Sequence, residues 1–342
     1  MSRPTMRAWQ YDSVAGGLEK NLKINDTATQ PTISDDEILV EVHAIALNPA
    51  DYKVSESAPI TALGVVCIPC MDFCGRVAKA GRKVDSFQIG EWVFGTKGGA
   101  VSNGTLGQYV SVSQNMLTSL PAGVETEDAA SVGVVGITEI QAIQPNVKPG
   151  DKVFINGGSG GTGVCGIQIA KALGCHVTTT CSTGNVKLCE SLGADEVIDY
   201  KTQNVVEALA AKGPIFQLAV DNVGSPADLY KQSASYLAPG GKFVQVGATV
   251  SLGSFAQITS NFLVPGFLGG GRRPYQVLLP KPSTDDLKQL GAWMKDGRVR
   301  AVLDEVFEWE DAPRAFEKLK TGRSRGKLVV RVKQDLGKSS AS

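Results

Sequence analysis

Short segments in which apolar and polar residues alternate make up much of the first third of the chain. The clearest run over 6–11, 37–43, 90–95 and 108–112, and glycine, proline and aspartate interrupt the pattern between them. Alternation with a period of two predicts β-strands that bury one face. We therefore predict a β-rich domain in this part of the chain.

The pattern changes after Ala129. Segments with helical periodicity then alternate with short apolar runs, which predicts an α/β fold with a doubly wound parallel sheet. A helix over 284–295 should end at Gly297, and 325–331 should form another strand. Since the parallel sheet is complete by then, we expect this last strand to return to the first domain. The strands of the parallel sheet are expected around Val153, Val177, Val197, Leu218, Phe243 and Val277.

The segment 151–174 predicts a strand, a glycine-rich turn and a helix in one piece. This context is typical of dinucleotide binding, because glycines let the backbone approach the pyrophosphate and the helix N-terminus favours its negative charge. A glycine-rich surface loop without a ligand is the alternative. The turn fits G-x-G-x-x-G and contains Gly158, Ser159, Gly160, Gly161, Thr162 and Gly163. Further expected cofactor contacts are Val223, Val246, Gly247 and Lys327.

Residues after the second strand of this sheet indicate which dinucleotide binds. NAD sites usually have Asp or Glu about 20 residues beyond the glycines, but the segment 176–182 ends without an acid. Ser182, Asn185 and Lys187 offer hydrogen-bond donors and one positive charge, and Tyr200 closes the third strand. These groups suit a 2′-phosphate, so we expect NADPH. The alternative is that Lys187 only lies on a solvated helix face.

Composition narrows the class of protein. The 342 residues allow about two domains, and Lys plus Arg equals Asp plus Glu at 34 each, so no basic excess indicates a nucleic-acid partner. No apolar run is long enough to span a bilayer, and 1–22 has no apolar core of a signal peptide. Seven cysteines without such a signal are expected to be reduced thiols. We expect a cytoplasmic protein with a small-molecule substrate and no membrane partner.

Several motifs resemble the zinc-independent branch of the medium-chain dehydrogenases/reductases, which contains quinone oxidoreductases and enoyl reductases. They are 48–53 (NPADYK), 71–75 (MDFCG), 90–95 (GEWVFG), the glycine loop, 192–200 (LGADEVIDY) and 325–327 (RGK). Within that family the chain is most similar to fungal-type reductases that include the trans-acting enoyl reductases of polyketide assembly. The resemblance implies a GroES-like catalytic domain from both chain ends, 1–126 and 298–342. It also implies an inserted Rossmann NADP(H)-binding domain, 127–297, with the active site in the cleft between them.

The same resemblance predicts that no metal is bound. Asn48, Met71 and Val134 stand where zinc-bearing relatives have their ligands, and none is a usual zinc ligand. Cys67, Cys70 and Cys74 form C-x2-C-x3-C, but a closed zinc site needs four ligands. We expect buried free thiols there instead. Cys70 also departs from the family, which commonly has glycine at this position.

Without a metal, the substrate has to be electrophilic already, such as an enone, an enoyl thioester or a quinone. The resemblance implies that Asn48, Lys53 and Thr138 lie beside the nicotinamide. Lys53 would stabilise a developing enolate or contact the ribose, and Thr138 would donate to a carbonyl. Their alternatives are a turn residue, a solvated side chain and an ordinary helix residue. Water or Tyr52 would deliver the proton.

Two other functions are kept open. One is an NADPH-binding scaffold or sensor without significant turnover, and the other is a zinc alcohol dehydrogenase. The family's usual dimer makes a homodimer the first expectation, and a polyketide synthase is an expected partner. Arg272 and Arg273 are expected to be surface charge, with contact to a phosphopantetheine as the alternative.

Overall fold

The computed structural model describes residues 3–57, 65–98, 103–247, 252–264 and 270–332. The chain divides into two compact units. Unit 1 contains Met1–Ile137 and Lys281–Ser342, and unit 2 contains Thr138–Pro280. Within the described ranges, no helix is both long and apolar enough to span a membrane.

Unit 1 is built around a seven-stranded sheet with β3 (Glu37–Ala46) at its centre. Buried and exposed side chains alternate only weakly along the ten residues of this strand, because most of its side chains are buried. The strands β4, β6 and β15 all pair with it. The sheet order is β14-β15-β3-β4-β5-β7, with β6 also paired to β3. Its other strands are β4 (Asp72–Ala80), β5 (Trp92–Thr96), β6 (Tyr109–Ser113), β7 (Leu117–Ser119), β14 (Leu303–Phe307) and β15 (Lys327–Arg331). A separate two-stranded sheet of this unit pairs β1 (Thr5–Gln10) with β2 (Lys23–Thr29).

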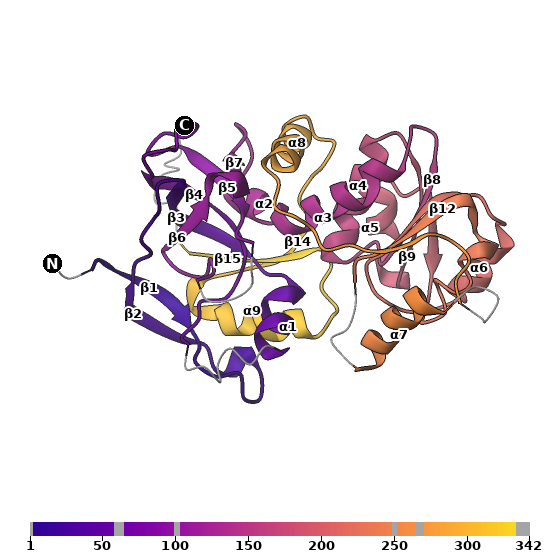
Figure 1. The fold of residues 1–342 in the computed structure, drawn as a ribbon, viewed down its shortest axis with the longest axis horizontal. Helices are drawn as coiled ribbons and strands as arrows, with labels where there is room; N and C mark the ends of the chain where they lie inside the picture. The colour runs from indigo at the N-terminus through magenta and orange to yellow at the C-terminus, as the bar shows by residue number, and fades with distance from the viewer. Residues whose placement is uncertain (1–2, 58–64, 99–102, 248–251, 265–269, 333–342) are drawn as a thin grey trace. The chain divides into compact units, whose positions relative to one another are not determined.

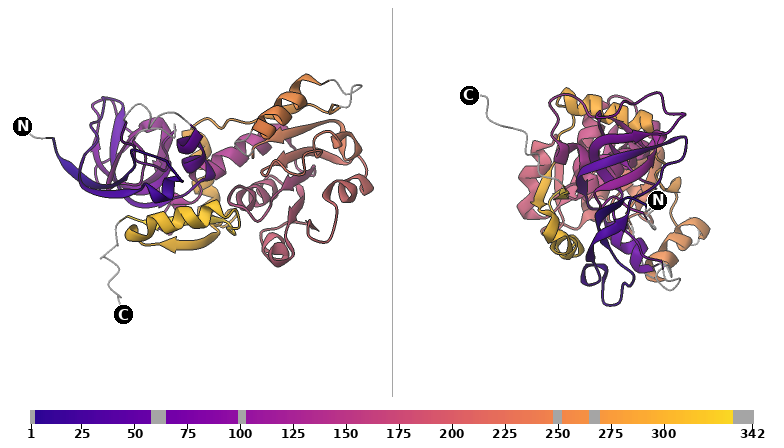
Figure 2. Two further views of the ribbon diagram at one scale, coloured as in Figure 1. Left: turned by 90° about the horizontal axis from the view of Figure 1, so that it is seen from below. Right: turned by 90° about the vertical axis from the view of Figure 1, so that its left-hand side faces the viewer.

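The C-terminal strand returns to this unit, as predicted. β15 pairs antiparallel with β3 and parallel with β14, and Figure 1 shows β15 next to β3. α9 (Ala312–Lys320) packs against β15 and against α1 (Pro49–Ser57), and Figure 2 shows α9 in yellow near the C-terminal end. The predicted strands of the first third also form, as β1, β3, β5 and β6.

Two helices that the expected boundaries assign to the nucleotide-binding domain belong to unit 1. α2 (Thr126–Ala130) packs against β3, β4 and β5, while α8 (Thr284–Lys295) packs against β7. α8 has the predicted bounds. It begins where the Ser283 side chain accepts from the Asp286 backbone N–H, and Gly297 follows its C-terminus with a φ of 77°.

Unit 2 is a parallel sheet of six strands in the order β10-β9-β8-β11-β12-β13. The first three strands run outward to one edge and the last three to the other, which is the doubly wound order of a dinucleotide-binding fold. All six predicted strand positions lie in this sheet. The strands are β8 (Lys152–Asn156), β9 (His176–Cys181), β10 (Glu196–Asp199), β11 (Phe216–Asp221), β12 (Leu237–Gln245) and β13 (Tyr275–Val277).

The helices of unit 2 follow its strands along the chain. A core cluster of this unit contains Phe154, Phe216, Tyr236 and Phe243, whose rings are fully buried. The bounds of the helices are α4 (Gly161–Ala172), α5 (Val186–Ser191), α6 (Val205–Ala211) and α7 (Leu252–Leu263), and α3 (Gly133–Ile143) begins in unit 1 and ends in unit 2.

Candidate active site and cofactor-binding residues

A buried polar cluster in unit 1 joins both ends of the chain. The Lys327 Nζ donates to Asn48 Oδ1 at 2.6 Å, and the Asn48 Nδ2 donates to Asp72 Oδ2 at 2.8 Å. The Lys327 Nζ also lies 3.5 Å from Asp72 Oδ2. Asn48 precedes α1, Asp72 begins β4 and Lys327 begins β15, so the antiparallel pairing of the sheet brings them together. Each side chain is almost fully buried.

Asp72 also holds the start of α3. Its Oδ1 accepts from the Val134 backbone N–H at 2.8 Å. A Cβ at Gly133 would lie 2.4 Å from the same oxygen, so glycine is needed for this approach. Burial raises the pKa of the Asp72 carboxyl, while Lys327 and the Asn48 hydrogen bond act in the opposite direction.

Asp51 extends the cluster along α1. Its Oδ2 accepts from the Asn48 backbone N–H at 2.7 Å, and burial raises the pKa of Asp51 to about 8. Lys53 is partly buried, which lowers the pKa of its ammonium group. Tyr52 lies beside Lys320, whose Nζ is 5.3 Å from the centroid of its ring, and burial raises the pKa of the Tyr52 phenol. α1 therefore carries two of the residues singled out from the sequence.

The positions aligned with zinc ligands lie in apolar or already bonded surroundings. Met71 is buried, and both polar atoms of the Asn48 side chain have the partners given above. Among the residues that the structure describes, no three His, Cys, Asp or Glu side chains are grouped so that they could hold a metal ion. All seven cysteines are buried free thiols.

Cys70 adopts a left-handed backbone conformation, with a φ of 77°. A side chain is disfavoured there, which explains why glycine suits this position in the resembling family. The Cys70 carbonyl accepts from Thr105 N at 3.1 Å, and Thr105 Oγ1 donates to the Asp72 carbonyl at 3.0 Å. The strained residue is therefore fixed next to the buried cluster.

The predicted glycine loop of unit 2 is tightly packed at two of its glycines. A Cβ at Gly158 would lie 2.1 Å from Thr179 Oγ1, and one at Gly163 would lie 2.2 Å from the Gly157 carbonyl oxygen. At Gly160 the nearest atom would be 3.5 Å away, which is ordinary contact. Gly160 directly precedes α4, and no side chain caps the start of this helix. The first residues of the helix are Gly161 and Thr162. This arrangement fits the pyrophosphate of a dinucleotide.

Of the predicted ribose residues, Asn185 contacts the glycine loop and Ser182. Asn185 Nδ2 donates to Ser159 Oγ at 3.1 Å and to Ser182 Oγ at 3.3 Å. Lys187 is exposed on α5, and half of the Tyr200 surface is exposed. Lys201, which the sequence analysis missed, has its Nζ 5.5 Å from the centroid of the Tyr200 ring.

A second group of predicted contacts follows the strands β11 and β12. A Cβ at Gly247 would lie 2.0 Å from the Asn222 carbonyl oxygen, and one at Gly157 would lie 2.5 Å from Val223 Cγ2. The Val246 N–H donates to the Asp221 carbonyl at 2.9 Å. The carboxyl ends of β8, β11 and β12 therefore converge here, which is where open α/β sheets bind ligands.

Thr138 and Glu139 lie next to each other on α3, in unit 2. Thr138 is buried, and Glu139 is fully buried and was missed from the sequence. A single acid in an apolar helix gives no sequence signal of a partner, so only the fold reveals that Asn222 Nδ2 donates to its Oε1 at 2.7 Å.

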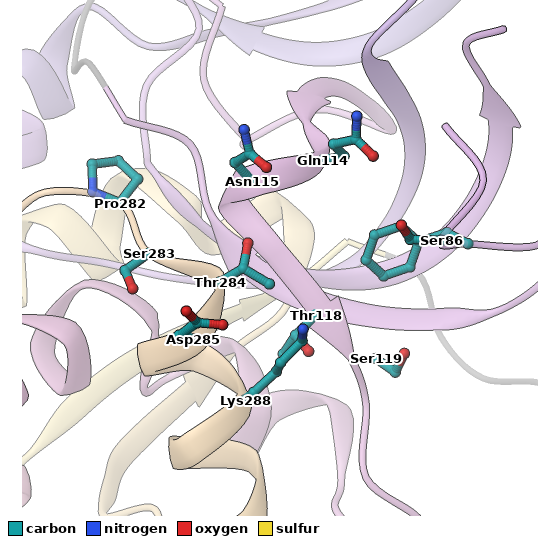
Figure 3. Close-up of a pocket in the computed structure, with 11 residues that line it drawn as sticks. Ser86, Gln114, Asn115, Thr118, Ser119, Pro282, Ser283, Thr284, Asp285 and Lys288 are labelled. Carbon is teal, nitrogen blue, oxygen red and sulfur yellow. The ribbon is translucent and has the colours of Figure 1, made fainter. Parts of the chain in front are cut away.

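A pocket of about 520 Å³ lies in unit 1 at the start of α8. Figure 3 shows polar side chains around it, and none of the predicted site residues contributes to its lining. The residues that line it include Ser86, Gln114, Thr118, Ser283, Asp285 and Lys288.

Arg273, which is expected from the sequence to be surface charge, donates from Nε to the Leu237 carbonyl at 3.0 Å in unit 2.

Comparisons with known proteins agree with both folds. Residues 34–122 match the alcohol dehydrogenase GroES-like domain, and residues 192–330 match the zinc-binding dehydrogenase family. The trans-enoyl reductase pgmF of Aspergillus terreus is 43% identical, over 96% of each chain. A zinc-type alcohol dehydrogenase-like protein of Schizosaccharomyces pombe is 33% identical, over 96% of this chain and 97% of that protein.

A solved structure supports the same assignment. The quinone oxidoreductase from Coxiella burnetii superposes with a TM-score of 0.84 at 30% identity, covering 96% of this chain and all of that one. The sequence identity extends over nearly the whole of both chains. The fold described above likewise combines a GroES-like domain with a Rossmann-type parallel sheet. The chain therefore belongs to the medium-chain dehydrogenase/reductase family, in the branch of enoyl reductases and quinone oxidoreductases, whose members use a nicotinamide cofactor.

Proposed function

We propose that the protein uses NADPH, without a metal, to reduce a carbon–carbon double bond conjugated to a carbonyl group, or a quinone. The observation that carries the proposal is the hydrogen bonding of the Asn48 side chain. Asn48 stands at a position where zinc-bearing relatives have a zinc ligand. Its amide oxygen accepts from Lys327 and its amide nitrogen donates to Asp72. A neutral amide is not a usual zinc ligand, and the adjacent ammonium would repel a metal cation. These residues do not fit catalytic zinc.

The substrate class follows from this chemistry. A site without a Lewis acid favours acceptors that are already electrophilic, and it polarises them with hydrogen bonds. The names of the relatives, a trans-enoyl reductase and a quinone oxidoreductase, support the two proposed classes. The resemblance to trans-acting enoyl reductases further supports an enoyl thioester delivered by a polyketide synthase.

NADPH supplies the hydride when bound. Around it, Gly160 would leave room for the pyrophosphate, while Gly158 and Gly163 allow the loop to pack closely against Thr179 and the Gly157 backbone. Ser182 and Asn185 would donate to the 2′-phosphate. The other proposed contacts are Ser159, Gly161, Thr162, Lys187, Tyr200, Val223, Val246, Gly247 and Lys327.

The roles of the remaining residues concern charge and orientation. Lys53 would stabilise the negative charge that develops on the substrate oxygen, and Thr138 would donate to a carbonyl. Asn48 would orient the acceptor through the cluster that fixes its amide. The proton at carbon would come from water or from the Tyr52 phenol.

Oxidation of NADPH by enones, enals, enoyl thioesters and quinones tests this function, with NADH in parallel and with a strong chelator in a matched series. We expect turnover of at least one acceptor class with NADPH and no loss with the chelator. Activity lost on chelation and restored by zinc would make the protein a zinc dehydrogenase. Tight NADPH binding without turnover of any acceptor would instead indicate a scaffold or sensor.

A further inference from the structure

Glu139 is an acid in the apolar interior of unit 2. It lies on α3 and has no exposed surface. Across from it, Gly166 on α4 leaves the space for the carboxyl group, because a Cβ at Gly166 would lie 2.7 Å from Glu139 Cδ. α3 and α4 are neighbours in Figure 1, as this contact requires. The packing is therefore shaped around the Glu139 side chain.

The hydrogen bonds around Glu139 are incomplete in a complementary way. Asn222 Nδ2 donates to Glu139 Oε1 at 2.7 Å. Glu139 Oε2 and Asn222 Oδ1 are both buried, and neither has a hydrogen-bond partner within the described residues. Two acceptors without a donor are costly in an interior. One proton on Oε2 would remove both defects, because a carboxylic acid and a primary amide can exchange two hydrogen bonds.

Nearby charges do not favour the carboxylate form. Asp221 precedes Asn222, and its own carboxyl accepts from Asn156 Nδ2 and from backbone N–H groups. The titratable side chains of α4 are the buried Cys165 and Lys171, and Lys171 is paired with Asp195. Burial raises the pKa of Glu139 to about 8, with the Asn222 hydrogen bond opposing it. The acid is therefore mainly protonated at neutral pH.

The partner of Glu139 sits in the turn that carries proposed cofactor contacts. Gly247 packs against the Asn222 backbone, and Gly157 of the glycine loop packs against Val223. Displacement of Asn222 would therefore move three segments at the carboxyl ends of the strands. The Asp221 carboxylate fixes the backbone of this turn, because its Oδ1 accepts from Val223 N and Gly224 N at 3.0 and 2.9 Å.

We propose that Glu139 is a positioning residue that binds Asn222 in its protonated form through two hydrogen bonds and thereby holds the turn 222–224 in the shape that binds the dinucleotide. The proposal rests on the proposed function, in that NADPH is the ligand. Loss of the proton leaves two buried acceptor oxygens without a donor and breaks one of the two proposed bonds. Affinity should therefore fall as the pH rises through the pKa of Glu139.

Titration of NADPH binding across the alkaline range tests this, using the dissociation constant measured by calorimetry or cofactor fluorescence. We expect wild-type affinity to fall as the pH rises through about 8. Glu139→Gln keeps a donor and an acceptor at every pH, so its affinity should match the wild type at neutral pH and lose the alkaline decline. Glu139→Ala and Asn222→Ala should each weaken binding about tenfold, since each removes the pair. The double variant should be no weaker than either single change.

Glu207→Gln on α6 is the control, because it removes a carboxylate from an exposed position of the same unit. It should keep the wild-type pH profile. An alkaline decline that persists in Glu139→Gln would overturn the proposal. Infrared difference spectroscopy gives a readout that needs no cofactor: the wild-type spectrum minus the Glu139→Gln spectrum at neutral pH should contain a protonated carboxylic acid band, whereas the Asp51 acid, whose pKa burial also raises to about 8, is common to both proteins and cancels. A difference spectrum without this band would also overturn the proposal. If the band is present but the wild type does not bind NADPH, the proposed function fails and the positioning role fails with it.

Discussion

Each unit buries an aspartate at the carboxyl or amino end of a strand, but the two units satisfy it differently. In unit 1, Asp72 lies 3.5 Å from the Lys327 ammonium and accepts from Asn48 and Val134 N. In unit 2, Asp221 accepts from two backbone N–H groups and from the amides of Asn156 and Gln245. The donors given for Asp221 are all neutral.

This difference separates two kinds of sensitivity. Removing the cation of a buried ion pair strongly lowers the free energy of unfolding, because the charge of the buried carboxylate is then no longer compensated. A carboxylate held by several neutral donors depends on the shape of the surrounding turn, which in unit 2 is the proposed binding turn. In the proposed function, the exposed Lys187 supplies positive charge for the cofactor phosphate.

The largest effect is expected from Lys327→Met, which removes the cation but keeps the length of the side chain. Breaking a buried pair costs about 3–5 kcal/mol of the free energy of unfolding, because the buried Asp72 carboxyl would have to keep its charge without a partner or take up a proton at neutral pH. The cost should shrink as the pH is lowered, since a protonated Asp72 no longer needs the ammonium. Urea denaturation at neutral and acidic pH measures both quantities.

Two further variants sharpen this test. Lys318→Met breaks ion pairs with Asp304 and Glu305 nearer the surface of the same unit, and should cost only about 0–1 kcal/mol. Combining Lys327→Met with Asp72→Asn removes both buried charges and should recover part of the loss. If Lys327→Met costs no more than Lys318→Met, the buried ion pair does not stabilise unit 1.

The sequence predicts the elements of both folds well. The apolar runs mark the six parallel strands because both faces of such a sheet are buried, and the helix predicted over 284–295 has the bounds of α8. The return of β15 to the first domain follows from counting strands. The boundaries of the two units depend on which strands each helix packs against, and the periodicity of the sequence does not predict that packing. This is why the sequence alone does not assign α2 and α8 to unit 1.

The candidate site is predictable only where a local pattern carries it. The glycine loop has such a pattern, and two of its glycines have packing reasons that only glycine satisfies. Lys327 was predicted as a cofactor contact, and that role stays a prediction, while its ammonium bonds to Asn48, 279 positions away. Glu139 and Asn222 are likewise far apart in sequence, so the direction of their side chains is known only from the fold.

The next largest effect concerns the source of positive charge in unit 2. Lys187→Ala should weaken NADPH binding by roughly ten- to a hundredfold, because a charge-assisted hydrogen bond contributes about 1.5–3 kcal/mol. NADH has no 2′-phosphate, so its affinity should hardly change. The difference should shrink at high salt, since Lys187 is exposed. Lys201→Ala is the matched variant, because the Lys201 Nζ lies 5.5 Å from the centroid of the Tyr200 ring. Equal loss for both cofactors in both variants would contradict a phosphate contact.

The smallest effect concerns backbone strain, where the units also differ. Among the described residues, every positive φ in unit 2 belongs to glycine, whereas Cys70 in unit 1 has a φ of 77°. A left-handed residue with a side chain costs roughly 1–2 kcal/mol, and part of that is offset because glycine gains more freedom on unfolding. Cys70→Gly and Cys70→Ala both lose the buried thiol, so their difference isolates the strain. We expect the glycine variant to be more stable than the alanine variant by about 1 kcal/mol in urea denaturation. The same pair of changes at Cys165, in the middle of α4, should give the opposite order, because alanine is favoured over glycine in a helix. Equal stabilities of the two Cys70 variants would mean that the backbone relaxes when the thiol is removed, and that the strain belongs to the packing of Cys70 rather than to the turn.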